Sequence, residues 1–556
     1  MNNYQIADHF SMLSKLMDIH GENSFKSKSY STAAFNIEKL PAEASSMDMP
    51  TLASMKGIGE STCKKIAELL STGRLQVLDE LVANTPPGIL DMLQIKGLGP
   101  KKIAVIWNEL GIESLGELEY ACNENRLVTL KGFGAKTQES VLQNIVYFKQ
   151  NIGFYLWAEA EQFANALLNN LKENFPEYQF DLSGAIRRQM ETLEYVDLVT
   201  NLPAAAITAH FGQIDGATTS AEPELVVSLP GSPKTRFHVA ATTDYYTTLW
   251  ATSCSEDFLA AFADGYQMPV APDSEDAIFA HNQLPFVPAM LREDAAILRS
   301  PTLSATINNL IRPADIRGII HSHSTWSDGV HTLEEMARAA KDKGYEYLVI
   351  SDHSQTAVYA EGLKPEKVAA QHQEIDRLNA LLAPFKIFKS IESDILGDGS
   401  LDYSSQVLAT FDMVIASVHS NLKMTQEKAM DRVLTAIRNP YTTVLGHPTG
   451  RLLLSRKGYP LDHKLVIDTC AAHNVAIEIN AHPKRLDIDW RWVSYAMERG
   501  VLLSVNPDAH SIDGYKDTYY GVMVAQKGGL SAARNMSSFS LAELEAHLAV
   551  QQLKRG

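Results

Sequence analysis

The sequence of 556 residues contains little cysteine, no long hydrophobic run and no excess of positive charge. Its 4 cysteines, Cys63, Cys122, Cys254 and Cys470, stand far apart, which disfavours both a disulfide framework and a cysteine zinc site. No apolar run is long enough to span a bilayer, and the polar start MNNYQIADHF lacks the pattern of an export signal. We therefore predict a cytoplasmic protein with no membrane attachment.

The net charge of −17 weakens any general attraction to a polyanion. Lysines nevertheless cluster beside glycine turns near the N-terminus, whereas acidic stretches such as AEPELV and DSEDA come later. With 45% hydrophobic and 21% charged residues, the composition is that of a globular protein, and the length predicts three or four domains. Any surface that binds nucleic acid should therefore be local.

Three N-terminal segments share an apolar-Lys-Gly-apolar-Gly core before a helical pattern: SMKGIGESTCKKIAELL, QIKGLGPKKIAVIWNEL and TLKGFGAKTQESVLQNI. Glycine lets backbone N–H groups approach a phosphate, and the following helix adds its positive end. A single copy would indicate only a link between packed helices, but three copies with flanking lysines favour phosphate contacts that do not read sequence. The predicted DNA-binding residues are Gly57, Gly59, Lys64, Lys65, Gly97, Gly99, Lys101, Lys102, Gly132, Gly134 and Lys136.

These repeats resemble helix-hairpin-helix motifs, and GENSFKSKSYSTAAFNI resembles the small N-terminal domain of family X DNA polymerases. Residues 155–310 then follow that family's palm and thumb in order. LSGAIRRQMETLEYVDLV resembles the palm segment in which two arginines, here Arg187 and Arg188, precede a catalytic strand, and LPFVPAMLRED resembles the end of the thumb. Lys26 and Lys28 are candidates for a Schiff-base lyase, although exposed lysines there are more often phosphate contacts.

The palm-like segment departs from the family pattern where its chemistry would lie. A polymerase palm holds two magnesium ions with carboxylates on one strand face, which residues i and i+2 share. Those positions are Tyr195 and Asp197, and Glu194 is expected to point to the opposite face. We align His238 with the third carboxylate and Ala185 with the family's nucleotide-binding serine. The sequence thus predicts a palm that folds without polymerising, with magnesium as a cofactor only if the palm is active.

Histidine is concentrated in the C-terminal part, since 11 of the 17 histidines lie between His321 and His510. Seven apolar runs alternate there with helical patterns: RGIIHSH, YLVISDH, KIFKSIES, MVIASVHS, TTVLGHP, VAIEINAHP and VLLSVNPDAH. This alternation predicts a parallel barrel, in which the C-terminal ends of all strands meet on one face. Six of the seven runs lead to candidate metal ligands: His321, His323, Asp328, His353, Glu392, His419, His447, Asp508 and His510.

Imidazole and carboxylate ligands together suit zinc, manganese or iron. Nine candidates exceed the needs of one ion, and three divalent ions with one bridging carboxylate is the natural count. Such a cluster generates a metal-bound hydroxide at neutral pH and needs no side-chain nucleophile to hydrolyse a phosphate ester. Asp352 is expected to orient His353, and Arg451 and Arg485 are expected to hold substrate phosphate. Four further histidines are expected to be structural: His331, His463, His473 and His482.

The segments DIRGIIHSHSTWSDG, VISDHS, SIESDILGDGSLD, ASVHSN, LGHPTGR and NPDAHS resemble the polymerase and histidinol phosphatase (PHP) domain. The whole chain resembles bacterial family X polymerases that carry this domain at the C-terminal end. The resemblance implies a manganese-dependent 3′→5′ exonuclease, sometimes with related activities at damaged DNA ends. It also implies three ions, held by His321, His323, Glu392 and Asp508, by Glu392, His419 and His447, and by Asp328, His353 and His510.

We predict a multidomain chain with an all-α N-terminal part, an α+β polymerase-like palm and thumb, and a distorted (βα)7 barrel. The predicted domains are residues 1–85 with the first helix-hairpin-helix motif, a fingers-like domain at 86–150, the palm and thumb at 151–310, and the PHP domain at 316–540. The expected partner is gapped, 3′-ended or single-stranded DNA, in repair at the nucleoid. Three alternatives stay open: an active polymerase with exonuclease, a small-molecule phosphatase of the histidinol phosphatase kind, and a non-catalytic DNA-end scaffold.

Overall fold

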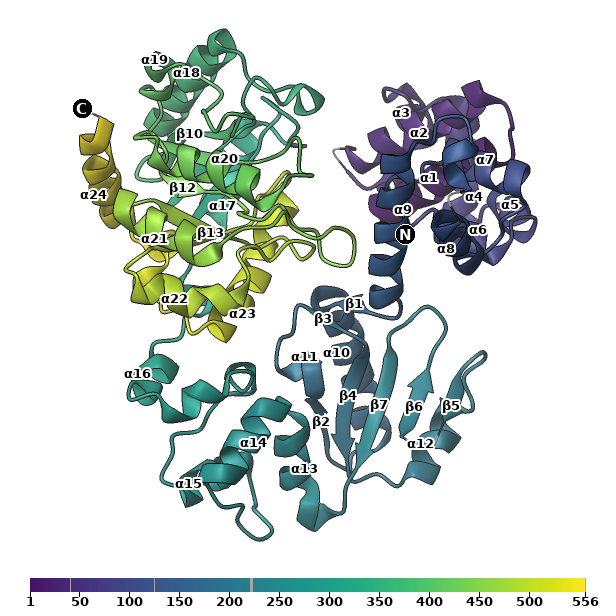
Figure 1. Cartoon of the computed structure of the whole chain (residues 1–556), viewed down its shortest axis with the longest axis vertical. Helices are drawn as coiled ribbons and strands as arrows, with labels where there is room; N and C mark the ends of the chain where they lie inside the picture. Colours follow the sequence, from purple (N-terminus) through teal and green to yellow (C-terminus); the bar gives the residue numbers. More distant parts are fainter. Residues whose placement is uncertain (41, 125, 221–223, 556) are drawn as a thin grey trace. The chain divides into compact units, whose positions relative to one another are not determined.

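The computed structural model describes residues 1–40, 42–124, 126–220 and 224–555. The chain divides into two compact units, Met1–Ile152 and Gly153–Gly556 (Figure 1). The first unit is helical, and the second contains a five-stranded sheet and a seven-stranded sheet. In the described part of the chain, every helix is too short or too polar to cross a membrane.

The first unit is built around a single hydrophobic core. Phe10 and Ile37 belong to the same buried cluster as Ile106 and Leu118, so the predicted division at residue 85 does not separate two cores. The helices are α1 Asn3–Ile19, α2 Ser24–Glu38, α3 Met49–Ser54, α4 Glu60–Thr72, α5 Gln76–Ala83, α6 Pro87–Met92, α7 Pro100–Leu110, α8 Leu115–Asn123 and α9 Ala135–Asn151.

The second unit begins with the predicted palm and thumb. A mixed sheet has the strand order β2-β4-β7-β6-β5, and β4 pairs with β7 in parallel. Three helices that follow the sheet form their own core around Trp250, Phe258 and Phe279. The strands are β1 Tyr155–Leu156, β2 Phe180–Ser183, β3 Thr192–Leu193, β4 Tyr195–Thr200, β5 Thr218–Ser220, β6 Leu225–Ser228 and β7 Lys234–Val239. The helices are α10 Trp157–Asn174, α11 Gly184–Arg187, α12 Ala204–Phe211, α13 Tyr245–Thr252, α14 Glu256–Gly265, α15 Glu275–His281 and α16 Leu303–Asn308.

All seven predicted C-terminal runs form strands of one parallel sheet, in the order β14-β13-β12-β11-β10-β9-β8. The strands are buried on both faces, which explains why their sequences are continuously apolar. Ala509 nearly closes the sheet into a barrel, because its carbonyl accepts from the His323 amide at 2.8 Å and its own amide donates to the His321 carbonyl at 3.3 Å. The strands are β8 Gly318–Ser322, β9 Tyr347–Ile350, β10 Lys386–Asp394, β11 Met413–Ser417, β12 Val444–Leu445, β13 Ala476–Asn480 and β14 Leu503–Asn506.

Helices pack on the barrel strands along the chain and confirm the predicted strand-then-helix fold (Figure 1). The last helix lies beyond the predicted domain end at residue 540, yet its Leu544 and Leu548 share a core with Ile320 and Val349 of the first strands. The barrel therefore continues almost to the C-terminus. Its helices are α17 Leu333–Asp342, α18 Pro365–Leu382, α19 Ser405–Leu408, α20 Gln426–Arg438, α21 His463–His473, α22 Val493–Glu498, α23 Thr518–Lys527 and α24 Leu541–Gln552.

Candidate metal centre

Glu392, near the end of β10, is the centre of the cluster that the barrel topology brings together. Its Oε1 lies 3.0 Å from His419 Nε2 and 3.0 Å from His447 Nε2. Its Oε2 lies 3.0 Å from His353 Nδ1. The side chain is only 1% exposed. Because both oxygens face imidazole nitrogens, this carboxylate has the geometry to bridge two ions.

The remaining candidates gather around two aspartates. Asp508 Oδ1 lies 3.1 Å from His323 Nε2 and 3.4 Å from His321 Nε2. Asp328 Oδ1 lies 3.4 Å from His510 Nε2. Three overlapping groups have ligand atoms within 4.8 Å of one another: His323, Asp328, His353 and His510; His321, His323 and Asp508; and His353, Glu392 and His419.

These three groups resemble the three ligand sets that the family resemblance implies, but two histidines also appear in a group to which the resemblance does not assign them. His323 lies within reach of the Asp328 group, and His353 lies within reach of Glu392, so each can serve either of two neighbouring positions. His447 stands outside the three groups but contacts Glu392. The structure therefore brings all nine predicted ligands to one place.

The donor atoms fit divalent cations. Among the described residues, the buried His321 Nε2, His323 Nδ1 and Glu392 Oε2 have no hydrogen-bond partner. Leaving a buried polar atom unsatisfied costs roughly 1–3 kcal/mol, which coordination would offset. Nitrogen and oxygen donors without sulfur suit zinc, manganese or iron. The types of donor atom in the cluster are therefore suitable for binding metal ions.

Carboxylates and imidazoles shift each other's protonation strongly. Burial alone would raise the pKa of Glu392, but His419 and His321 hold it well below its ordinary value. Burial likewise opposes protonation of His419, yet Glu392 raises the pKa of this histidine to about 10. The carboxylates therefore favour positive charge in the cluster. A bound divalent cation can provide that charge in place of a protonated imidazole.

Two carboxylates behind the ligands were missed from the sequence. Glu478 in β13 accepts from His321 Nδ1 at 2.6 Å and from the His447 amide at 3.0 Å. Asp394 lies 2.5 Å from His419 Nδ1. Such partners fix the tautomer and orientation of a ligating imidazole. A glutamate inside the apolar run VAIEINAHP was the available signal for Glu478, and this is the one run that offered no predicted ligand.

Asp352, which was expected to orient His353, makes hydrogen bonds with other groups. Its carboxylate accepts from the Ser324 amide at 2.8 Å, from Ser327 Oγ at 2.5 Å and from Gln371 Nε2 at 2.6 Å. These hydrogen bonds tie the Asp352 carboxylate to the loop after β8 and to Gln371 of α18. Asp352 therefore fixes the segment that carries Asp328.

The two predicted phosphate-binding arginines have different surroundings. Arg485 Nε lies 3.9 Å from Asp508 Oδ2, beside the cluster. Arg451 instead donates to the Arg485 carbonyl at 2.9 Å and to Asp489 Oδ2 at 2.6 Å. Its guanidinium also donates to the Leu486 carbonyl. Arg451 thus holds backbone, whereas Arg485 lies beside the cluster.

The predicted structural histidines lie outside the three ligand groups of the described residues. His463 stacks on Trp492 with ring centroids 4.8 Å apart, and His331 Nδ1 accepts from the Ile512 amide. His482 is near the cluster, where burial lowers its pKa to about 4 although Asp508 opposes this. For His473, only the backbone carbonyl makes a described hydrogen bond, with Lys554.

The predicted palm carboxylate is held by an arginine and a histidine of the chain itself. Asp197 Oδ1 accepts from Arg236 Nε at 2.6 Å and from His238 Nε2 at 2.9 Å, and its side chain is 3% exposed. Burial would raise the pKa of Asp197, but the hydrogen bonds from His238 and Arg236 keep it below its ordinary value. Arg236, which also pairs with Glu224, thus places a positive charge directly beside this carboxylate.

Glu194 was expected to point to the face opposite Asp197. It occupies a bend before β4, and it lines the same pocket of about 380 Å³ as Ala185, Tyr195 and Asp197. Strand alternation does not apply to it because the strand begins at Tyr195. The Arg236 guanidinium lies over the Tyr195 ring, 4.7 Å from the ring centroid.

Both palm arginines are engaged by protein groups. Arg187 donates to Ser253 Oγ at 2.9 Å and pairs with Glu275. Arg188 pairs with Glu293 and donates to the carbonyls of the segment after α13. Neither guanidinium is directed at an open phosphate position by these contacts.

The three glycine repeats share one local backbone geometry. The first glycine of each repeat is left-handed, with φ of 76° at Gly57, 89° at Gly97 and 87° at Gly132. The second glycine is the N-cap of the next helix in every case, at Gly59, Gly99 and Gly134. A Cβ at any of these glycines except Gly57 would meet no described atom within 4 Å, so the turns are open to a ligand.

The predicted lysines differ in availability. Lys64, Lys101 and Lys136 are exposed, while Lys65 and Lys102 are half-buried. Lys102 Nζ donates to the Gly97 carbonyl at 3.3 Å. The sequence prediction omitted the exposed lysines that stand directly before the first glycines, although the repeat itself displays them: Lys56, Lys96 and Lys131.

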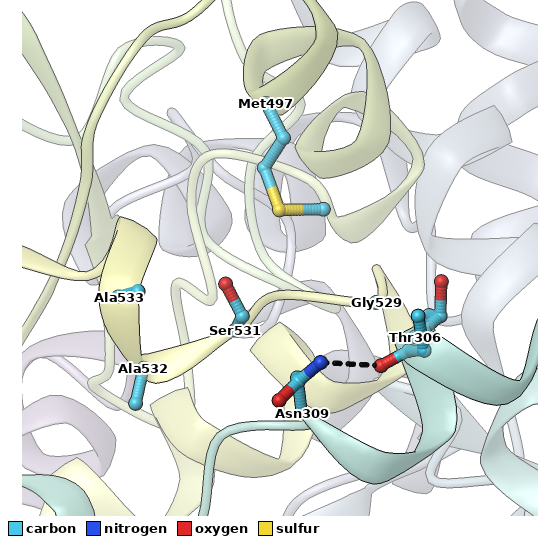
Figure 2. Close-up of a pocket in the computed structure, with 8 residues that line it drawn as sticks. Thr306, Asn309, Met497, Gly529, Ser531, Ala532 and Ala533 are labelled. Carbon is cyan, nitrogen blue, oxygen red and sulfur yellow. Dashed lines mark hydrogen bonds between the residues drawn. The ribbon is translucent and has the colours of Figure 1, made fainter. Parts of the chain in front are cut away.

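A separate cavity of about 620 Å³ lies between α16 and the segment after α23. Thr306, Asn309, Met497 and Ser531 surround it (Figure 2), and its lining contains no acidic, basic or metal-ligating side chain. It offers no chemistry comparable to that of the strand-end cluster.

Family models match three parts of the chain. A model described as "Helix-hairpin-helix domain" matches residues 1–75, a "SAM-like Helix-hairpin-helix tandem" matches 89–144, and a "PHP domain" matches 320–482. A "Probable phosphatase" of Caldicellulosiruptor saccharolyticus is 29% identical over 205 residues, which cover 34% of this chain and 78% of that protein. Another, from Vibrio parahaemolyticus, is 28% identical over 225 residues, covering 38% and 84%.

Fold and cluster together define a family X polymerase framework that carries a C-terminal PHP domain. One relative spans the whole arrangement: the "DNA polymerase/3'-5' exonuclease PolX" of Bacillus subtilis (strain 168) is 34% identical over 556 residues, 96% of each chain. The chain belongs to the PolX family.

Proposed function

We propose that this protein is a DNA-binding, metal-dependent phosphoesterase that removes nucleotides from 3′ ends, and that its palm no longer extends primers. The observation that carries the proposal is the contrast between the two sites. All nine ligands converge in the barrel, whereas Asp197 of the palm is paired with Arg236 and His238. The full-length similarity to a polymerase and exonuclease supports DNA as the substrate.

In the proposed reaction, the residues of the chain bind and orient. When bound, up to three divalent ions such as manganese, zinc or iron activate water and offset phosphate charge. Glu392 and Asp508 fix the spacing of the ligand groups, and Glu478 holds the ring of His321. Arg485 is placed to pair with a phosphate of the terminal nucleotide.

The glycine turns of the first unit would hold the DNA backbone through their open N–H groups and exposed lysines. Such contacts do not distinguish sequences, so the proposed substrates are gapped, 3′-ended or single-stranded DNA. We place this activity in DNA repair at the bacterial nucleoid.

The test uses the purified full chain and DNA labelled at the 5′ end, single-stranded or gapped, with manganese. We expect shortening from the 3′ end that is lost in a His321→Ala/His323→Ala variant. A parallel reaction with magnesium and deoxynucleotides should show no extension. No shortening by the wild type would refute the nuclease, and extension abolished by Asp197→Ala would refute the silent palm.

A second candidate is the hydrolysis of a small phosphate ester by the barrel. It is supported by the two relatives named as probable phosphatases, which cover 34% and 38% of this chain. Release of inorganic phosphate from histidinol phosphate or p-nitrophenyl phosphate measures it directly. A kcat/KM for these esters above that for DNA ends would favour this candidate over the nuclease.

A further inference from the structure

The segment 484–491, which follows β13, carries Arg485 to the metal cluster and is held from both sides. On the barrel side, Arg451 donates to the carbonyls of Arg485 and Leu486, as described above. The Arg451 guanidinium also pairs with Asp489 Oδ2 at 2.6 Å. One arginine thereby fixes both the start and the end of the segment.

The second hold comes from the palm. Glu191 stands in the bend between α11 and β3, and its side chain is 11% exposed. Its Oε1 accepts from Arg491 Nη1 at 2.8 Å, and its Oε2 accepts from Trp490 Nε1 at 3.2 Å. The same Arg491 nitrogen donates to Asp489 Oδ1 at 2.9 Å. Glu191, Arg491, Asp489 and Arg451 thus form one continuous chain of charged hydrogen bonds.

Further contacts join the palm turn to the barrel at this junction. Lys527 Nζ, whose side chain is 0% exposed, donates to the Arg188 carbonyl at 2.8 Å and lies 4.5 Å over the Trp490 ring. Gln189 contacts Met523 across the same junction. Every palm residue involved belongs to the turn 188–191, directly after the helix where the family pattern places nucleotide-binding groups.

We propose that Glu191, Asp489 and Arg451 are positioning residues that hold Arg485 beside the metal cluster, so that the palm supports phosphate binding in the barrel. The proposal rests on the proposed function in taking Arg485 as a phosphate contact. It assigns the palm a role that needs no magnesium and no polymerisation. Hydrogen bonds between charged groups are stronger than those between neutral groups, and Glu191, Asp489 and Arg451 are mostly buried although Arg491 is half exposed.

The first experiment measures the segment without any substrate. Hydrogen exchange of the amides of 485–492 is compared between the wild-type full chain and the variants Glu191→Gln and Asp489→Asn. We expect exchange faster by about tenfold in both, because local opening loses a charged hydrogen bond. Asp468→Asn is the matched control, since it removes the 2.7 Å ion pair with Arg499 elsewhere on the barrel. Unchanged exchange in both variants would overturn the proposal.

The second experiment tests whether the segment acts through Arg485. For hydrolysis of a labelled oligonucleotide and of bis(p-nitrophenyl) phosphate, Arg485→Ala should raise KM about tenfold or more with kcat changed little. Glu191→Gln should raise KM in the same direction by less. The KM of the double variant should equal that of Arg485→Ala alone, because Glu191 is proposed to act only through Arg485. Additive effects in the double variant would overturn the proposal, as would a loss in kcat alone.

The two experiments separate this inference from the proposed function. If the segment responds in hydrogen exchange and only the small diester is hydrolysed, the DNA nuclease fails and the positioning role stands. If DNA is shortened as expected while Glu191→Gln changes neither exchange nor KM, the nuclease stands and the positioning role fails.

Discussion

At the scale of single residues, the metal centre depends on side chains that touch no substrate. Glu478 is fully buried and bonds both the His321 ring and the His447 amide. Burial would raise its pKa, but His321 keeps the pKa below its ordinary value, so the carboxylate stays charged. It therefore sets which nitrogen of His321 is left for a metal.

We expect Glu478→Gln to weaken metal binding by about 10–100-fold, the usual cost of losing a carboxylate behind a ligating histidine. Equilibrium dialysis against manganese with metal analysis measures this directly. Glu498→Gln, at an exposed position on α22, is the control. Equal affinities in the two variants would show that Glu478 has no role in the site.

The pairing of Asp197 predicts a specific acid dependence. Its folded-state pKa lies below the unfolded value of about 3.8, so the stabilisation is present above that pH and is lost as the pH falls through the folded pKa. Asp197→Asn should lower stability by roughly 1–3 kcal/mol at pH 7, and the deficit should shrink only below about pH 4. Thermal unfolding from pH 3 to 8 measures it, with exposed Asp342→Asn for comparison. A deficit that is unchanged at pH 3 would contradict this account.

At the scale of elements, the hairpins should contribute to DNA affinity through charge. Lys64 and Lys136 are exposed beside open glycine turns. Each lysine-to-alanine change should weaken binding of all sequences alike and reduce the salt dependence of log K by about one unit. Fluorescence anisotropy at several salt concentrations, in EDTA to prevent cleavage, tests this. Lys343→Ala on the barrel should leave the slope unchanged, and an unchanged slope in the hairpin variants would refute the contact.

The sequence predicted all seven barrel strands and the place of the nine candidate ligands, because strand order in a parallel barrel determines where strand ends meet. The sequence did not predict those contacts that depend on the direction in which a side chain points. Nothing in the pattern distinguishes Arg451, which holds backbone, from Arg485, which faces the cluster. Strand alternation cannot place Glu194, because β4 begins one residue later, at Tyr195. Long-range pairings such as Glu191 with Arg491 have no local signal at all.

At the scale of the whole molecule, the two compact units predict two separable responses to metal. Manganese at 100 times its dissociation constant should raise the unfolding free energy of the second unit by about 2.7 kcal/mol. The first unit has its own core and should be unaffected. Calorimetry of the full chain with manganese or EDTA measures both transitions. A shift shared equally by both units would contradict independent folding.

Barrel closure through Ala509 has a consequence for how the protein is made. The first strand supplies His321 and His323, and the last supplies Asp508 and His510, so the ligand set spans almost the whole barrel sequence. A nascent chain still on the ribosome lacks the final two ligands until about residue 510 has been added. Under the proposed function, the first unit, Met1–Ile152, is synthesised long before the metal-ligand set is complete, so DNA binding would precede any ability to cut.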